Sequence, residues 1–305
     1  MVTEVVTECR WEPWWPDGRR VAVRRQSPSG RATIVGRVSE GAADRGVGGL
    51  PDFDRPPVTE VALGVQFNPL PVRAIDLGPL RQRWFADYPI VQEQPPLEPA
   101  MEDGPRAMPV IMFGPAPMMR HWFMSEDQTH LLQVQQDRLI LNWRRMSDDA
   151  EYPRYPVLRA VLEHRLAEFS EYVDGAHLQL RVTQAEVTYI NDLGRDGDLP
   201  ARLDEVARVW ASNPGHHLGE PNEVRFAAAY PVPDAPGPAR LLVSLDPQRR
   251  ADGTPTVLLT LTLRGKPAGE TTQDALEFLD LGRAHIVRSF TELTAETMHE
   301  RWGRR

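Results

Sequence analysis

The chain has 305 residues, a formal net charge of −8 and a single cysteine, Cys9. A lone cysteine excludes an internal disulfide, and an acidic balance argues against unspecific nucleic-acid binding, which needs clustered cations. No stretch approaches the roughly 18 apolar residues of a membrane span, and Glu4 and Glu8 are foreign to a signal peptide, so we expect a cytoplasmic bacterial protein.

Residues 1–55 are expected to form a flexible or accessory N-terminal segment. The first fifty residues carry eight arginines against six acidic residues, a net charge of +2 that leaves −10 for the remainder of the chain. The alternative is a partner-binding arm that uses Trp11, Trp14 and Trp15, because tryptophan and arginine are the side chains that interface hot spots favour.

Residues 56–175 read as a strand, a helix, four strands and a long helix. In the opening strand, Val61, Leu63 and Val65 alternate with polar or small residues, and this period of two predicts one buried and one exposed face. The proline-rich stretch 91–106 is expected to be a surface loop. The other predicted elements are a helix at Ile75–Tyr88, strands at Met108–Phe113, Met118–Ser125, Thr129–Gln135 and Arg138–Arg144, and an amphipathic helix at Tyr155–Val173.

Residues 176–305 repeat this order with one strand fewer. The opening strand, Leu178–Leu193, changes phase between Val182 and Val187, which indicates a bulge. The last strand alternates strictly, as expected for a sheet with one solvated face. The other predicted elements are a short helix at Leu203–Trp210, strands at Glu223–Tyr230, Arg240–Leu245 and Thr256–Arg264, and a final helix at Thr272–Trp302.

Together the two halves predict an α+β fold in which a curved, mainly antiparallel sheet, or two such sheets, packs against long helices. The order β-α-β4-α in 56–175 and β-α-β3-α in 176–305 indicates an internal duplication and a saddle-shaped or helix-grip-like architecture. The pattern fits one continuous sheet and two packed sheets equally well.

Four segments, in this order, resemble a family of uncharacterised bacterial proteins of about 250 residues that are sporadically distributed among genomes. The segments are PPVTEVALGVQFNP, RHWFMSEDQTHLLQVQQDRLILNWRR, VTYINDL and LDLGRAHIVRSFTELTAETMHERWG. They span residues 56–303 and leave out the first fifty residues. The family carries no assigned reaction, so the resemblance implies a shared fold and no catalytic residues.

The last predicted helix carries the strongest candidate site. Its residues His285, Arg288, Glu292, Glu296 and His299 follow one another at spacings of three and four, which places them on one helix face. The outer histidines and the central glutamate lie two turns apart, about 10 Å by helical rise, too far for one metal ion. This stripe is either an ordinary solvated face or a polar strip that faces a groove between sheet and helices.

Two further groups of residues are candidates for contacts with a ligand or partner. Glu60 and Glu186 occupy similar positions in the two opening strands, as a solvated pair or as a pair lining the sheet. A basic-aromatic patch is predicted from Arg138, Trp143, Arg144 and Arg145. A saddle-shaped sheet with such a patch would suit a nucleic-acid groove, but the charge of −10 on the same part of the chain opposes this.

The chain has no Gly-x-Ser-x-Gly nucleophile motif, no phosphate-binding loop of the Walker type and no dinucleotide-binding glycine motif. We therefore expect no catalytic residue, no cofactor and no metal site. The sequence favours a non-enzymatic module that binds a protein partner or small ligand, and it is compatible with a homodimer. The alternatives are an enzyme of unfamiliar type that uses the histidines and glutamates of the groove, and a regulatory protein that binds nucleic acid.

Overall fold

A computed structural model describes residues 49–98, 118–195, 197, 199, 203–209, 217, 223–250 and 252–305. The predictions for residues 1–48 and for the strand Met108–Phe113 lie outside the described residues. No described helix has the length and apolarity needed to cross a membrane.

One open antiparallel sheet organises the described part of the chain. Its nine strands follow the order β2-β3-β4-β5-β1-β6-β9-β8-β7. This confirms the predicted α+β fold with a curved antiparallel sheet. Of the two predicted alternatives, the structure has one continuous sheet. The strands are β1 (Val58–Phe67), β2 (Ile90–Gln94), β3 (Arg120–Met124), β4 (His130–Gln135), β5 (Arg138–Arg144), β6 (Val182–Asp192), β7 (Phe226–Pro231), β8 (Ala239–Arg249) and β9 (Pro255–Gly265).

The opening strands of the two halves, β1 and β6, pair at the centre of the sheet. Their register places Leu63 beside Val187, and each strand also pairs with the last strand of its own half, β5 or β9. The phase change predicted within 178–193 corresponds to a register irregularity between Val182 and Gln184. The halves thus share a strand order, while their origin by duplication stays a prediction.

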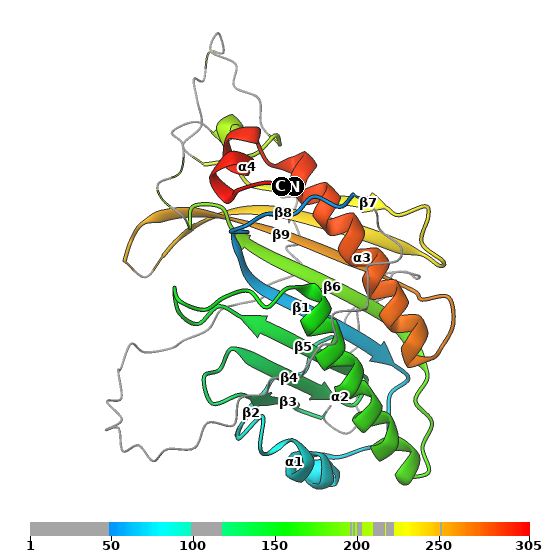
Figure 1. The fold of residues 1–305 in the computed structure, drawn as a ribbon. Helices are drawn as coiled ribbons and strands as arrows, with labels where there is room; N and C mark the ends of the chain where they lie inside the picture. Colours follow the sequence, from blue (N-terminus) through cyan, green and yellow to red (C-terminus); the bar gives the residue numbers. More distant parts are fainter. Residues whose placement is uncertain are drawn as a thin grey trace, which may run out of the picture. The chain divides into compact units, whose positions relative to one another are not determined.

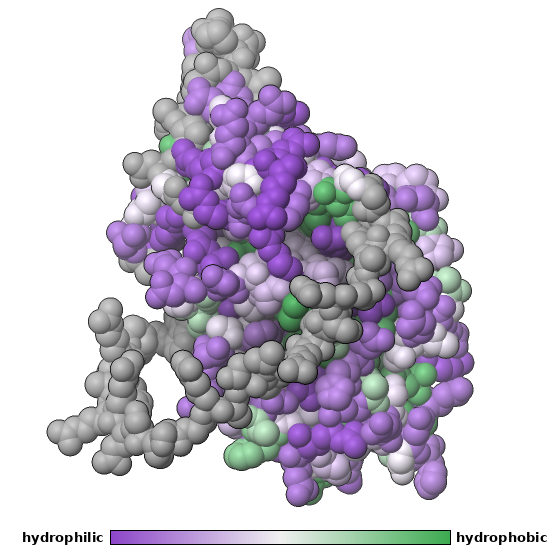
Figure 2. Space-filling model, viewed as in Figure 1, coloured by the Kyte–Doolittle hydropathy of each residue, from purple (hydrophilic) through white to green (hydrophobic). Residues whose placement is uncertain are grey.

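Two long helices cover one face of the sheet. In Figure 1, α2 (Tyr155–Gly175) and α3 (Thr272–Leu293) lie side by side across the strands, and α1 (Gly78–Trp84) lies near β2 and β3. The space-filling view in Figure 2 shows that hydrophilic side chains dominate the outer surface seen from this side. The apolar residues of both helices therefore point inward, and the fully buried ones include Leu162, Phe169, Leu279 and Ile286.

Alternate side chains of the strands complete this core. Val61 and Leu63 of β1 lie beside Trp143 and Leu141 of β5, and all four are at most 2% exposed. Side chains at the intervening positions point to the opposite face, since successive residues of a strand alternate. The described helices lie on the first face, so we call the opposite one the helix-free face.

Several predicted elements differ from the structure, and the strand predicted at Leu178–Leu193 begins only at Val182. The stretch predicted as a helix at Ile75–Tyr88 begins as a 3-10 turn (Ala74–Leu77) and continues as α1 only to Trp84. Residues 90–94, which include the start of the predicted loop, form the edge strand β2. The predicted helix Leu203–Trp210 is reduced, within the described residues, to a 3-10 turn at Leu203–Glu205. Tertiary contacts outweigh the weak local preferences of such short segments.

The predicted final helix is divided into α3 and α4 (Glu296–Trp302). Thr294 and Ala295 are extended, because the chain here pairs with residues 206–208: the Ala295 amide donates to the Val206 carbonyl, and the Arg208 amide to the Leu293 carbonyl. The Thr294 hydroxyl donates to the Phe290 carbonyl at 2.7 Å, a local bond that competes with helix continuation. The break separates the two ends of the predicted polar stripe.

Gly282 lies where α3 meets the sheet. A methyl group at this position would come within 2.5 Å of Val187 Cγ1 and 3.4 Å of Leu263 Cδ2. We expect Gly282→Ala to lower the free energy of unfolding by about 1–3 kcal/mol, as overpacked cores do, measured by urea denaturation. Gly175→Ala is the matched control, since nothing lies within 4 Å of its added methyl group. Equal midpoints for the two variants would contradict the close packing of α3.

Candidate functional site

The histidines of the predicted polar stripe lie in different environments. His285 on α3 is partly exposed, and its Nε2 lies 3.0 Å from Asp234 Oδ2 in the connection between β7 and β8. Arg288 is close enough to help hold the pKa of Asp234 below its ordinary value, and Glu292 is exposed. His299 lies on α4 and is 3% exposed. The five residues therefore do not share a helix face, because the helix is interrupted at Thr294.

His299 has a partner for each ring nitrogen. The Thr294 hydroxyl donates its proton to the Phe290 carbonyl, so its oxygen accepts from His299 Nε2 at 2.8 Å. His299 Nδ1 then accepts from Arg304 Nη1 at 3.3 Å. Burial, aided by the charges of Arg304 and Arg208, lowers the pKa of His299. A neutral ring with both nitrogens occupied ties α4 to the rest of the fold and has no free group for a ligand.

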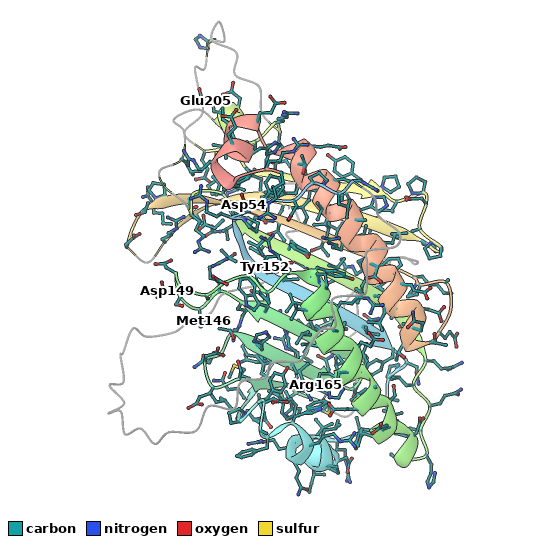
Figure 3. The ribbon with its side chains drawn as sticks, in the orientation of Figure 1. Asp54, Met146, Asp149, Tyr152, Arg165 and Glu205 are labelled. Atoms are coloured by element: carbon teal, nitrogen blue, oxygen red, sulfur yellow. The ribbon has the colours of Figure 1, made fainter. Side chains whose placement is uncertain are left out.

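Buried tyrosines on the helix side are likewise fully engaged. Tyr152 lies near the N-terminal end of α2 (Figure 3), and its hydroxyl is 2.9 Å from that of Tyr189. The Tyr155 hydroxyl donates to Asp280 Oδ1 at 2.7 Å, and Arg159 Nε donates to the same oxygen at 2.9 Å. Burial raises the pKa of Tyr189 to about 12. This cluster joins α2, α3 and β6, and Tyr155 and Tyr189 belong to the hydrophobic core.

The predicted basic-aromatic patch is divided between the two faces of the sheet. Trp143 faces the helices and is 2% exposed. The guanidinium of Arg145 lies over the Trp143 ring, 5.2 Å from its centroid. Arg138 and Arg144 lie at alternate positions of β5, on the helix-free face. The four residues therefore form no common patch.

The glutamates of the two opening strands both lie on the helix-free face. Glu60 follows Thr59 in β1, and Glu186 lies opposite Gly64 in β6. Glu186 forms an ion pair with Arg264 Nε at 3.4 Å. Glu60 is held by different partners, so the two glutamates have separate environments.

Polar side chains form a hydrogen-bonded chain across β3, β4, β5 and β1 on this face. Trp122 Nε1 donates to Gln133 Oε1 at 3.1 Å, and Gln133 Nε2 donates to Asn142 Oδ1 at 2.6 Å. Asn142 Nδ2 donates to Glu60 Oε1 at 2.7 Å. Gln133 and Asn142 are each 1% exposed. We call these four residues the polar network.

Two arginines flank the tryptophan of the polar network. The guanidinium carbon of Arg120 lies 5.4 Å from the centroid of the Trp122 ring, and that of Arg144 lies 5.6 Å from it. Both distances suit a cation–π interaction. Arg144 also donates to the Gln128 carbonyl at 3.2 Å. Arg120, Trp122 and Arg144 are called the arginine–tryptophan cluster below.

The chain that leaves β2 crosses the helix-free face beside this cluster. The Leu97 amide donates to Gln135 Oε1 at 2.8 Å, and Gln135 Nε2 donates back to the Leu97 carbonyl at 3.0 Å. Arg138 makes an ion pair with Asp137 at 2.8 Å and donates to the Glu98 carbonyl at 3.2 Å. These contacts fix one border of the candidate site.

Burial raises the pKa of Glu60, although the hydrogen bond from Asn142 and the charge of Arg144 act in the opposite direction. A raised pKa in the folded state means that protonated Glu60 stabilises the fold below its unfolded pKa of about 4.5, and that this contribution is lost as the pH rises through the folded pKa. At neutral pH the ionised Glu60 carboxylate therefore lowers the free energy of unfolding.

We expect Glu60→Gln to melt at a higher temperature than the wild type near neutral pH, because glutamine keeps the acceptor for Asn142 and cannot ionise. The advantage should shrink as the pH falls toward about 4.5. Thermal unfolding followed by circular dichroism across this range measures it, with the exposed Glu126→Gln as the control. Melting curves that shift equally for both variants at every pH would refute the prediction.

Arg120, Trp122 and Gln133 are not among the residues selected from the sequence. The signal that could have found them is alternation: Leu132 and Val134 of β4 face the core, while Gln133 between them is polar and still buried. Strand alternation shows that these side chains share a face, but the contacts of β3 with β4 and β5 appear only once the sheet order is known.

The described residues contain no group of three or more histidine, cysteine, aspartate or glutamate side chains arranged to hold a metal ion. Comparison with known proteins finds no family model that matches the chain. No curated protein matches it either.

Proposed function

We propose that the protein is a non-enzymatic binding module whose ligand contacts the helix-free face of the sheet at the arginine–tryptophan cluster. The observation that carries the proposal is the polar network, because the two amide side chains at its centre, Gln133 and Asn142, are almost wholly buried, where apolar side chains would serve the sheet equally well. Buried polar groups that are mutually satisfied orient their neighbours rigidly. Here the network fixes the orientation of the Trp122 ring, because Trp122 Nε1 donates a hydrogen bond to Gln133.

The same proposal includes membership in the sporadically distributed family and a cytoplasmic location. Between a protein partner and a small ligand, the half-buried Trp122 favours the small ligand or a single side chain, since the ring offers a limited surface. The helix side supports an enzyme less well, because His285 and His299 lie on separate helices and each has a partner. Nucleic acid is supported less well, because Trp143 of the predicted basic-aromatic patch lies on the opposite face of the sheet from Arg138 and Arg144.

Native mass spectrometry of the gently purified chain tests the proposal. We expect an added mass on the wild type that is lost from Trp122→Leu and kept by Phe85→Leu. Phe85 is the matched control, since it is an aromatic residue that is 56% exposed, follows α1 directly and lies outside the arginine–tryptophan cluster. A bare wild-type mass under several purification conditions, or equal retention by both variants, would argue against binding at this face.

A further inference from the structure

The side chain of Arg120 is buried with fewer acceptors among the described residues than it has N–H groups. It is 8% exposed, and its Nε and Nη1 atoms are buried with no hydrogen-bond partner among the described residues. Burial and the nearby charge of Arg138 lower the pKa of Arg120 to about 10. An unpaired buried cation is strongly unfavourable, whereas one held by an anion and hydrogen bonds is not.

The acceptors nearest in the sheet are already in use. Asp137 receives both Nε and Nη2 of Arg138, at 3.0 and 2.8 Å. Gln135 Oε1 accepts from the Leu97 amide. Arg144, on the other side of Trp122, also has a buried Nε without a partner. The arginine–tryptophan cluster therefore contains N–H groups that the described part of the fold does not satisfy.

The charge of this region specifies the kind of group that would satisfy them. Asp137 forms an ion pair with Arg138, and Glu60 lies close enough to Arg144 for their charges to attract. No described acidic side chain forms an ion pair with Arg120. A carboxylate would supply that missing negative charge. Guanidinium and carboxylate form strong charge-assisted hydrogen bonds, and the adjacent indole ring offers a surface for an apolar or aromatic body.

We propose that the ligand of this face carries a carboxylate, which Arg120 binds while Trp122 packs against the group that bears it. This rests on the proposed function and specifies its ligand class. The carboxylate belongs either to a free small acid or to the C-terminus of a peptide. Arg120 supplies the charge, the polar network orients Trp122, and Arg144 adds positive potential beside the ring.

Calorimetric titration with defined probes tests this proposal. The probes are benzoate, its neutral analogue benzamide, inorganic phosphate, and the dipeptide acetyl-Gly-Phe with a free or an amidated C-terminus. We expect benzoate to bind at least about tenfold more tightly than benzamide and more tightly than phosphate, given the strength of charge-assisted hydrogen bonds. Tighter binding of the peptide acid than of benzoate assigns the carboxylate to a chain terminus, and the reverse order assigns it to a small acid. Equal binding of the acids and their amides overturns the proposal.

Arg120→Met supplies a second, ligand-free measurement. Methionine keeps much of the length and removes the unpaired charge, so the variant should melt at a higher temperature than the wild type while losing at least about tenfold in benzoate affinity. Arg240→Met is the matched control, because Arg240 is exposed on β8 on the same face of the sheet, and it should leave benzoate binding unchanged. A lower melting temperature for Arg120→Met would mean that Arg120 is a structural cation and would overturn the proposal.

The two proposals can fail separately. A bound mass that depends on Trp122, together with no preference for acids over amides, would leave the binding face in place and remove the carboxylate. No bound mass and no binding of any probe would remove both.

Discussion

Replacing Trp302 with alanine is expected to lower the free energy of unfolding by about 3–5 kcal/mol, the range for large buried aromatic residues. Trp302 is fully buried, and its ring lies 5.3 Å from that of Phe290 and 6.2 Å from that of Phe53. The indole thus joins α4, the end of α3 and the segment that leads into β1. Its removal opens a cavity where three distant parts of the sequence meet.

Guanidinium chloride denaturation of Trp302→Ala measures this effect. Glu300→Ala is the control on the same helix, because Glu300 is exposed, and it should stay within about 0.5 kcal/mol of the wild type. Trp302→Phe should fall between them, since phenylalanine keeps much of the aromatic volume and the buried Trp302 Nε1 has no hydrogen-bond partner among the described residues. A loss below about 1 kcal/mol for Trp302→Ala would mean that α4 is not anchored through this ring.

Asn142→Leu is expected to lower the free energy of unfolding by about 2–4 kcal/mol, since each buried polar group left without a partner costs about 1–3 kcal/mol. Leucine has the branching and the number of side-chain heavy atoms of asparagine, but it can neither accept from Gln133 nor donate to Glu60. The buried Gln133 amide and the half-buried Glu60 carboxyl group would each lose a hydrogen bond. The expected loss therefore comes from desolvated polar groups and little from packing.

The matched control for Asn142→Leu is Gln92→Leu on β2, where the amide is exposed on the same face of the sheet. That variant should change stability by less than about 0.5 kcal/mol. The double variant Glu60→Gln with Asn142→Leu separates the loss at Gln133 from the loss at Glu60. It removes the negative charge of Glu60, to which Asn142 donates a hydrogen bond in the wild type. If Asn142→Leu were as stable as Gln92→Leu, the polar network would be solvated and could not orient Trp122.

These expectations place stability and binding on opposite faces of the sheet. The helix side is held by apolar side chains and by tyrosines and His299 whose partners are all present. The helix-free face holds a carboxyl group with a raised pKa, Glu60, and an arginine, Arg120, with two N–H groups that no described residue accepts. Ionisable groups in unfavourable surroundings are more common at functional sites than elsewhere in a protein. Removing them should therefore stabilise the empty protein and weaken its binding.

Periodicity in the sequence predicted the strongest elements well. The strand Arg138–Arg144 has the predicted bounds, and the helix predicted from Tyr155 to Val173 extends only two residues further. Both have a regular apolar pattern over their full length, and local spacing is sufficient to specify such elements. The edge strand β2 was missed because it is short and mostly exposed, so it lacks the alternation that reveals a half-buried strand.

The candidate site could not be read from the sequence in the same way. His285 and His299 have the spacing of a continuous helix, but the pairing of residues 293–295 with residues 206–208 interrupts it. The residues next to Thr294 in the sequence give no indication that this segment pairs with residues 206–208. Conversely, Trp122 and Glu60 are 62 positions apart, and only the strand order joins them through Gln133 and Asn142.

The sequence by itself determined that the described part of this protein is an α+β fold with an antiparallel sheet, because side-chain periodicity is a local property of each strand and helix. Tertiary structure alone decided that the sheet is continuous, where the last helix breaks, and which polar side chains meet. Those outcomes depend on hydrogen bonds and packing between residues far apart in the chain, and the energy of each such contact exists only after the chain has brought its partners together.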